Sequence, residues 1–86
     1  MSLVYNLVIS SSAKKFLKKQ NAESALRLKN AIVKLKSGLP KGDIKKLTGS
    51  QYFRLRVGNF RIIFKVEAES AIVFIDIIGN RGDVYK

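Results

Sequence analysis

The spacing of hydrophobic residues changes along the chain, from a helical period in the first half to a strand period in the second. Residues 21–37 repeat apolar side chains every three or four positions, which predicts an amphipathic helix. Residues 13–20 place Phe16 and Leu17 between lysines spaced four apart, a like-charge spacing that weakens an isolated helix. We therefore predict a helical hairpin whose first helix depends on the packing of these two apolar side chains.

Strand patterns precede and follow this hairpin. Residues 3–9 are rich in β-branched and aromatic side chains and lead into serines that can cap a helix. Residues 51–57 and 60–66 alternate apolar and polar side chains on either side of a Gly-Asn pair, as the two strands of a hairpin do. Residues 71–78 are nearly all apolar, which predicts a strand covered on both faces.

These elements predict one domain over residues 1–86, because a chain of 86 residues has no room for a second folding unit. The predicted fold class is α+β: an N-terminal strand, the helical hairpin, and then an antiparallel three-stranded meander. We expect both helices to pack on one face of the sheet, which leaves the other face for function.

Composition narrows the chemistry that the chain can perform. Lys and Arg number 17 against 6 Asp and Glu, so the formal net charge is +11, a value that attracts polyanions. The absence of cysteine and histidine excludes disulfides, thiolate zinc sites and imidazole catalysis, and we expect neither a metal nor a cofactor. We find no signal-peptide pattern and no run of about 18 apolar residues, so we expect a cytoplasmic protein without a membrane segment.

The positive charges divide into two groups, because most lysines lie on the predicted helices and the arginines gather on or after the predicted strands. Arg54, Arg56 and Arg61 alternate with core positions, so all three are expected on the open side of the sheet. Arg81 and Tyr85 follow the last strand and can fold toward the same surface. Since arginine binds phosphate bidentately, this face is a candidate site for single-stranded RNA, although arginines on the polar side of a strand can also serve only solubility.

Three blocks of sequence carry a family resemblance. They are KLTG at residues 46–49, YFRLRVGNFRIIF at 52–64 and IGNRGDVY at 78–85. Together with the N-terminal strand and the hairpin they extend over nearly the whole chain, which resembles the RelE/ParE toxin superfamily and is closest to its RelE branch. The resemblance implies the toxin of a type II toxin–antitoxin system, a ribosome-dependent endonuclease that cuts mRNA in the ribosomal A site and inhibits translation.

The resemblance also implies roles for three catalytic side chains. In that family a ribose 2′-hydroxyl attacks the adjacent phosphate, without a metal. By position, Arg61 would stabilise the charge that develops on the phosphate. Arg81 would bind the same phosphate or protonate the leaving oxygen, and Tyr85 would orient or deprotonate the nucleophile.

Binding contacts and partners follow from the same resemblance. Arg54 and Arg56 would position the RNA backbone, with Lys45 and Lys46 as looser contacts. The expected partners are mRNA on the ribosome, with the ribosomal RNA around it, and a cognate acidic antitoxin.

Two other functions stay open at this point. A ParE-like toxin would bind and poison DNA gyrase without nuclease activity, and it would have no need of Arg61, Arg81 and Tyr85 together. A structural RNA-binding module would bind RNA in a salt-dependent manner but would not stop growth when produced alone.

Overall fold

The computed structural model describes residues 5–37 and 44–80 of the chain. In chain order the elements are β1 (Asn6–Ile9), α1 (Ser11–Lys19), α2 (Ala22–Lys34), the 3-10 turn η1 (Leu35–Ser37), β2 (Ile44–Lys46), β3 (Tyr52–Val57), β4 (Phe60–Glu67) and β5 (Ile72–Asn80). Within these residues the sheet has five strands in the order β1-β5-β4-β3-β2. β1 runs parallel to β5, and every other pair of neighbours is antiparallel.

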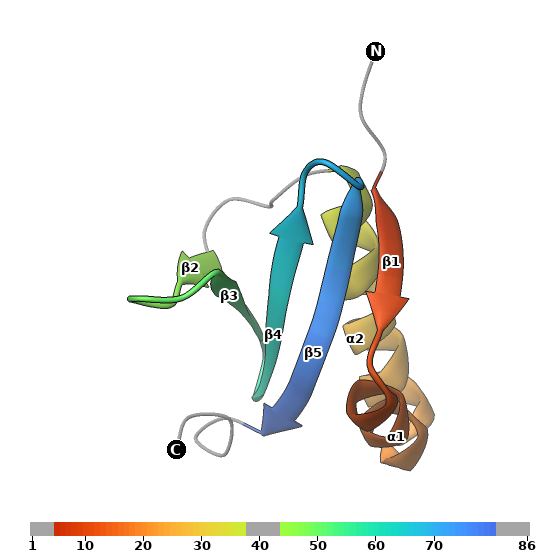
Figure 1. Cartoon of the computed structure of the whole chain (residues 1–86). Coiled ribbons are helices and arrows are strands. Elements are labelled where there is room, and N and C mark those ends of the chain that lie inside the picture. Colours follow the sequence, from red (N-terminus) through yellow and green to blue (C-terminus); the bar gives the residue numbers. More distant parts are fainter. Residues whose placement is uncertain (1–4, 38–43, 81–86) are drawn as a thin grey trace.

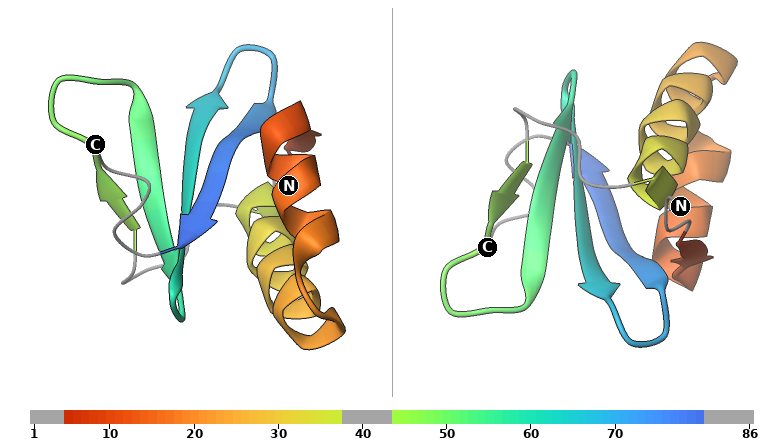
Figure 2. Two further views of the ribbon diagram at one scale, coloured as in Figure 1. Left: turned by 90° about the horizontal axis from the view of Figure 1, so that it is seen from below. Right: turned by 90° about the horizontal axis from the view of Figure 1, so that it is seen from above.

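Both helices lie on one face of the sheet. Figure 1 shows α2 behind β5 and β1 and α1 below the end of β1, and both views in Figure 2 show the two helices together on one side of the sheet. The predicted α+β fold, with its N-terminal strand, helical hairpin and antiparallel meander, is therefore confirmed. No helix in the described residues has the length and apolar character needed to cross a membrane. We call the sheet face turned away from the helices the open face.

The core fills the space between the helices and the inner face of the sheet. Leu17 of α1 and Leu28 and Ile32 of α2 are buried in it, at positions of the predicted apolar stripes. From the sheet, Phe64 is fully buried and its ring stacks with that of Phe53, with the centroids 5.6 Å apart. Because burial of apolar surface is the main favourable term in folding, these contacts hold the sheet that carries the open face.

Ser10 joins the start of α1 to the middle of β5. Its side-chain oxygen accepts a hydrogen bond of 3.1 Å from the backbone N–H of Ala13, which caps the helix. Its hydroxyl donates to the backbone carbonyl of Asp76, and its own N–H donates to the carbonyl of Ile75 at 2.9 Å. Ser10 therefore provides an acceptor for a backbone N–H in the first turn of α1 and attaches that helix to β5.

Replacing Ser10 with alanine is expected to lower the free energy of unfolding by about 1–2 kcal/mol, because the helix cap and the bond to β5 are both lost. Urea unfolding followed by circular dichroism measures the difference. Ser12→Ala, at an exposed position in the first turn of α1, is the matched control and should leave the midpoint nearly unchanged. Equal midpoints for Ser10→Ala and the wild type would contradict this role for Ser10.

The sheet has one more strand than the sequence predicts. β2 has three residues, of which two are lysines, and it is a strand because it pairs with β3. So short a segment carries no alternation that could be recognised in the sequence. The meander therefore has four consecutive antiparallel strands, from β2 to β5.

The prediction that β5 is covered on both faces is wrong. The helices cover one face only, and on the other face Ile77 is 40% exposed. A register shift between Ile63 and Phe64 sets these residues opposite Ile77 and Ile75, so β5 contains one extra residue, Asp76, at this point. The irregularity turns Ile77 toward the open face, and an apolar strand therefore presents part of its surface outward.

Candidate nucleic-acid interface

Two pairs of like charges lie side by side across the strands of the open face. Arg56 of β3 pairs with Arg61 of β4, and Lys45 of β2 pairs with Arg54 of β3. The residues that alternate with them belong to the core side, so all four side chains lie on the open face. Like charges directly opposite each other destabilise a sheet, so folding alone does not account for this arrangement. We call Lys45, Arg54, Arg56 and Arg61 the basic half of the open face.

The turn between β3 and β4 sets the register of the arginine pair. Gly58 and Asn59 connect the strands, and of the two only Gly58 has a positive φ, of 57°, as in a type II′ turn. A two-residue turn of this type matches the twist of the strands and fixes their pairing. Arg56 and Arg61 face each other as a direct result.

The three arginine side chains of the basic half differ in how far they are exposed. Arg54 and Arg61 are half-buried, whereas Arg56 is exposed. The Nε atoms of Arg54 and Arg61 are both buried, and that of Arg54 has no hydrogen-bond partner among the described residues. A buried donor without a partner costs free energy, so the contacts of the described residues do not by themselves account for Arg54. Phosphate oxygens accept hydrogen bonds, and guanidinium groups bind them through parallel N–H bonds.

Lys46 does not belong to the basic half. It pairs with Phe53, whose side chain lies on the core side of β3, so Lys46 is on the opposite face from its neighbour Lys45. The sequence groups the two lysines as looser RNA contacts, and the structure separates them. An RNA strand that contacts Lys45 on the open face cannot contact Lys46 at the same point.

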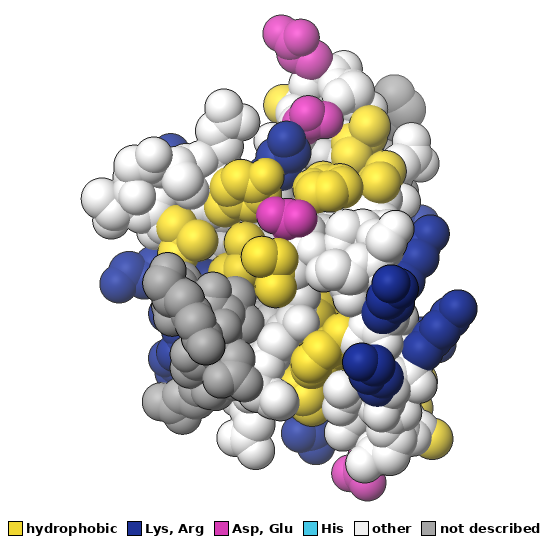
Figure 3. Space-filling view, turned by 60° about the horizontal axis from the view of Figure 1, so that its bottom comes forward, with side chains coloured by type: hydrophobic (Ala, Val, Ile, Leu, Met, Phe, Trp, Pro, Cys, Tyr) yellow, Lys and Arg dark blue, Asp and Glu magenta, His cyan; other side chains and the backbone are white. Residues whose placement is uncertain are grey.

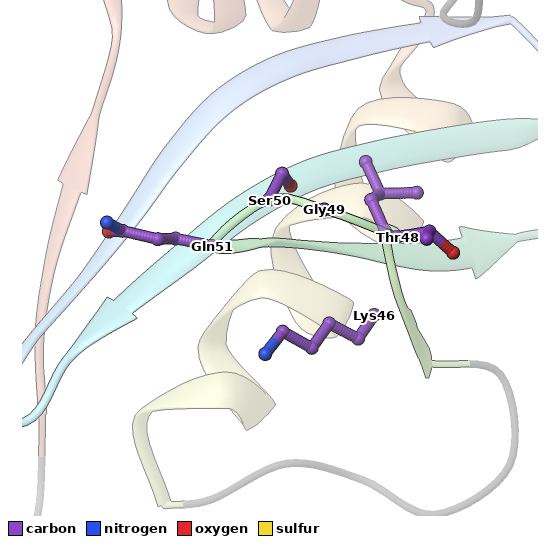
Figure 4. A pocket seen from close by; sticks show the side chains of 6 residues that line it. Lys46, Thr48, Gly49, Ser50 and Gln51 are labelled. Carbon is purple, nitrogen blue, oxygen red and sulfur yellow. The ribbon is translucent and has the colours of Figure 1, made fainter.

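The turn between β2 and β3 forms a hollow of about 550 Å³, lined by Lys46 and residues 47–51. Figure 4 shows the side chains of Lys46, Thr48 and Gln51 pointing in different directions rather than toward one another. Lys46 is the only charged side chain in this lining, and the hydroxyl oxygen of Ser50 accepts a hydrogen bond of 3.0 Å from a backbone N–H of β3. The hollow lacks polar groups that converge on one point, so we assign no site to it.

Two of the expected catalytic side chains, Arg81 and Tyr85, lie outside the described residues. The last strand, β5, ends at Asn80, and the preceding Gly79 pairs with Arg61. Asn80, the last described residue of β5, pairs with Phe60, the residue before Arg61 in β4.

The remaining half of the open face is apolar and aromatic. A row of paired residues crosses four strands in the order Val8, Phe74, Lys65 and Tyr52. The Nζ atom of Lys65 lies 5.8 Å from the ring centroid of Tyr52 and 5.7 Å from that of Phe74, so the ammonium group is held between two aromatic side chains. We call the following residues the apolar half of the open face: Val8, Tyr52, Ile63, Lys65, Ile72, Phe74 and Ile77.

The apolar half is visible in Figure 3 as hydrophobic side chains gathered over the sheet, with basic and acidic groups among them. Sequence reasoning does not single out Lys65 as a functional candidate. The alternation in β4 places it on the same face as Arg61, but its two aromatic neighbours come from other strands. Only the register of the sheet brings Tyr52 and Phe74 to it.

A second positive surface lies on the helices. Four of the nine residues of α1 are lysines, and two of them line a hollow of about 220 Å³ together with Leu17 and Lys29 of α2. The helices lie on the opposite face of the sheet from the basic half (Figure 2). The helix lysines and the arginines therefore cannot contact the same short segment of a ligand.

Comparison with known proteins places this fold among toxins. Residues 7–85 match the family described as the ParE toxin of the type II toxin–antitoxin system, parDE. A curated protein of Methanocaldococcus jannaschii, named as a candidate toxin, RelE1, is 34% identical over 86 residues, which cover 95% of this chain and 96% of that protein.

Two solved structures have a similar fold. The RelB–RelE antitoxin–toxin complex of Methanococcus jannaschii contains a chain with a TM-score of 0.72 and 28% identity, and the match covers 91% of this chain and 94% of that one. The toxin–antitoxin complex RelBE2 of Mycobacterium tuberculosis contains a chain with a TM-score of 0.79 and 20% identity, and the match covers 94% of this chain and 95% of that one. At 20% identity the second similarity concerns the fold alone.

Proposed function

The chain belongs to the ParE toxin family of type II toxin–antitoxin systems, and we propose that it is a metal-independent endonuclease that cuts mRNA in the ribosomal A site and so inhibits translation. The basic half of the open face carries this proposal. Its like-charge pairs, Lys45 with Arg54 and Arg56 with Arg61, oppose folding unless an anion binds between them. The phosphate backbone of single-stranded RNA supplies such anions in a row.

The proposed reaction needs only the RNA and side chains of the kinds present. The ribose 2′-oxygen forms a bond to the adjacent phosphorus, the bond from phosphorus to the 5′-oxygen of the next nucleotide breaks, and a proton passes from the 2′-hydroxyl to the leaving oxygen through the enzyme. Arg61 stabilises the negative charge that builds up on the phosphate oxygens. Arg81 binds the same phosphate or protonates the leaving oxygen, and Tyr85 orients or deprotonates the 2′-hydroxyl.

The other members of the basic half position the RNA. The half-buried Arg54 and the exposed Arg56 and Lys45 bind neighbouring phosphates. Lys46, on the opposite face, is not part of this set.

The proposed partners are mRNA on the ribosome and an acidic antitoxin, and the proposed location is the cytoplasm, where translation takes place. Two observations support the antitoxin. Similar chains occur in toxin–antitoxin complexes, and a net charge of +11 favours a partner of opposite charge.

A ParE-like gyrase poison without nuclease activity is the alternative, because the matching family is named for ParE. It would not need a row of paired cations on one sheet face, and the relative at 34% identity is named for RelE. Expression of the chain separates the two functions, since a gyrase poison leaves mRNA intact and produces DNA breaks linked to gyrase.

Arg81→Ala and Tyr85→Phe are each expected to lower the rate of mRNA cleavage by about 100-fold or more, because each removes a group that acts on the reacting atoms. The rate is measured in a translating extract by following full-length mRNA with time. Tyr5→Phe is the matched tyrosine control, because Tyr5 packs against the core and not on the open face. If both variants cut mRNA as fast as the wild type, these residue assignments are wrong.

A further inference from the structure

An arginine of α2 lies against the turn between β3 and β4. The Nη1 atom of Arg27 is 3.1 Å from the position that a Cβ atom at Gly58 would occupy, so its guanidinium group contacts the backbone of the turn. Figure 1 shows the N-terminal part of α2 and the β3–β4 turn at the same lower end of the molecule. A side chain that starts on the helical side of the sheet therefore reaches the tip of the hairpin that carries Arg56 and Arg61.

Gly58 leaves the room that this contact needs. A side chain at this position would meet the guanidinium group of Arg27 at closer than ordinary van der Waals distance. The φ of 57° also disfavours residues other than glycine. The glycine that sets the register of Arg56 with Arg61 therefore also admits Arg27 to the turn between them.

Arg27 forms no ion pair with the residues that the structure describes. Glu23 lies four positions before it on α2, a spacing and order that favour a salt bridge on the surface of a helix, yet the two side chains form none. Arg27 is exposed, so its guanidinium group is accessible to a ligand. The hairpin tip thus brings together three arginines: Arg27 on the helical side, and Arg56 and Arg61 on the open face.

These three guanidinium groups suit an anion that carries charges in a row. The exposed Arg56 and Arg27 lie on either side of a two-residue turn in which Gly58 has no side chain, so a strand of RNA can pass over the turn from one to the other. Each nucleotide of that strand supplies a phosphate, and a guanidinium group binds phosphate oxygens through two parallel N–H bonds.

We propose that Arg27 binds a phosphate of the mRNA next to those bound at Arg56 and Arg61, so that the RNA site extends from the open face over the tip of the β3–β4 hairpin to α2. This inference rests on the proposed function for the identity of the ligand. The phosphate at Arg27 lies outside the bond that breaks. Arg27 should therefore affect the affinity for RNA more than the rate of the chemical step.

Arg27→Gln tests this assignment, because glutamine keeps a long polar side chain without the charge. Lys29→Gln is the matched control on the same helix, since Lys29 is exposed and lines the hollow between α1 and α2 instead of contacting the turn. The probe is a short single-stranded RNA with 2′-O-methyl groups, which the proposed reaction cannot cut. Its dissociation constant is measured by fluorescence anisotropy over a range of salt concentrations, and thermal unfolding checks the fold of each variant.

Arg27→Gln is expected to weaken RNA binding about tenfold at low salt and to reduce the slope of log K against log salt concentration by about 0.7, the effect of losing one phosphate contact. Arg27→Lys keeps the charge and should retain the slope. Lys29→Gln should leave both affinity and slope close to those of the wild type. On ribosomes, Arg27→Gln should raise the KM of mRNA cleavage about tenfold and leave kcat within about twofold of the wild type.

Three results would overturn the inference. Equal affinity and slope for Arg27→Gln and the wild type would show that Arg27 does not bind this strand, and a raised KM on ribosomes would then assign its phosphate to ribosomal RNA. A lower unfolding temperature and a lower kcat with an unchanged slope would mean that Arg27 only supports the turn. Failure of the wild type to bind the RNA would also contradict it. If the wild type binds the RNA but does not cut mRNA, the proposed function fails, whereas the change in slope would still support the contact of Arg27 with RNA.

Discussion

Arg61→Ala is expected to lower the rate of mRNA cleavage by about 100-fold to 1,000-fold, the effect of removing one preorganised group that stabilises the transition state. Arg61 is held in place on both sides, by its pairing with Arg56 and by its pairing with Gly79 in β5. Its half-buried position excludes part of the water that would otherwise screen its charge. Single-turnover cleavage of mRNA in a translating extract measures the loss.

Two further variants make this result specific. Arg61→Lys keeps the charge but loses the planar pair of donors, so it should recover only part of the activity. Lys29→Ala removes an exposed cation from α2, on the helical side of the sheet, and should reduce cleavage by no more than a few fold. If Arg61→Ala cut mRNA at the wild-type rate, or if Lys29→Ala were equally impaired, the basic half would not be the site of the reaction.

Phe64→Ala is expected to lower the free energy of unfolding by about 3–5 kcal/mol. Phe64 is fully buried in the central part of β4 and stacks with Phe53 of the adjacent strand. Because a whole domain is stable by only about 5–15 kcal/mol, the variant is expected to be largely unfolded or close to it at physiological temperature. Urea unfolding monitored by circular dichroism measures the shift.

The matched control for this variant is Phe74→Ala, at a half-buried phenylalanine on the open face. It removes the same atoms from a position that is already partly in water, so it should lower the free energy of unfolding by less than half as much. Equal losses for the two variants would mean that the core does not lie where the structure places it.

Periodicity in the sequence predicts most of the fold. The apolar stripe of α2 and the alternation in β3 and β4 each extend over two or more turns or pleats, so each pattern has one reasonable interpretation. The alternation also predicts that Arg54, Arg56 and Arg61 share a face. Local patterns therefore suffice wherever one side of a regular element is buried.

Features that depend on pairing between strands distant in sequence cannot be predicted from local patterns. β2 is too short to show a pattern, and the separation of Lys45 from Lys46 depends on its register against β3. The exposure of Ile77 depends on an extra residue in β5. The position of that extra residue cannot be recognised from the sequence, because the residues around it are nearly all apolar. The alternation in β3 and β4 assigns Tyr52, Ile63 and Lys65 to the open face, but the other members of the apolar half appear in the sequence to belong to the core: Val8, Ile72, Phe74 and Ile77.

The structure also shows that the positive charges of the chain lie on two different faces. The lysines of α1 lie on the helical face, whereas the paired cations of β2, β3 and β4 lie on the open face beside an apolar surface. The helix lysines can add long-range attraction to RNA, which is screened by salt. The paired cations are suited to contact phosphate directly, so substitutions there should affect cleavage more than substitutions on the helices.

The most direct test of the proposed function is to map the ends of mRNA fragments on ribosomes after brief expression of the chain. We expect the wild type to produce new ends within codons in the ribosomal A site, and we expect Arg61→Ala to produce almost none. Intact mRNA on ribosomes, together with DNA breaks linked to gyrase, would contradict the nuclease and favour the gyrase poison.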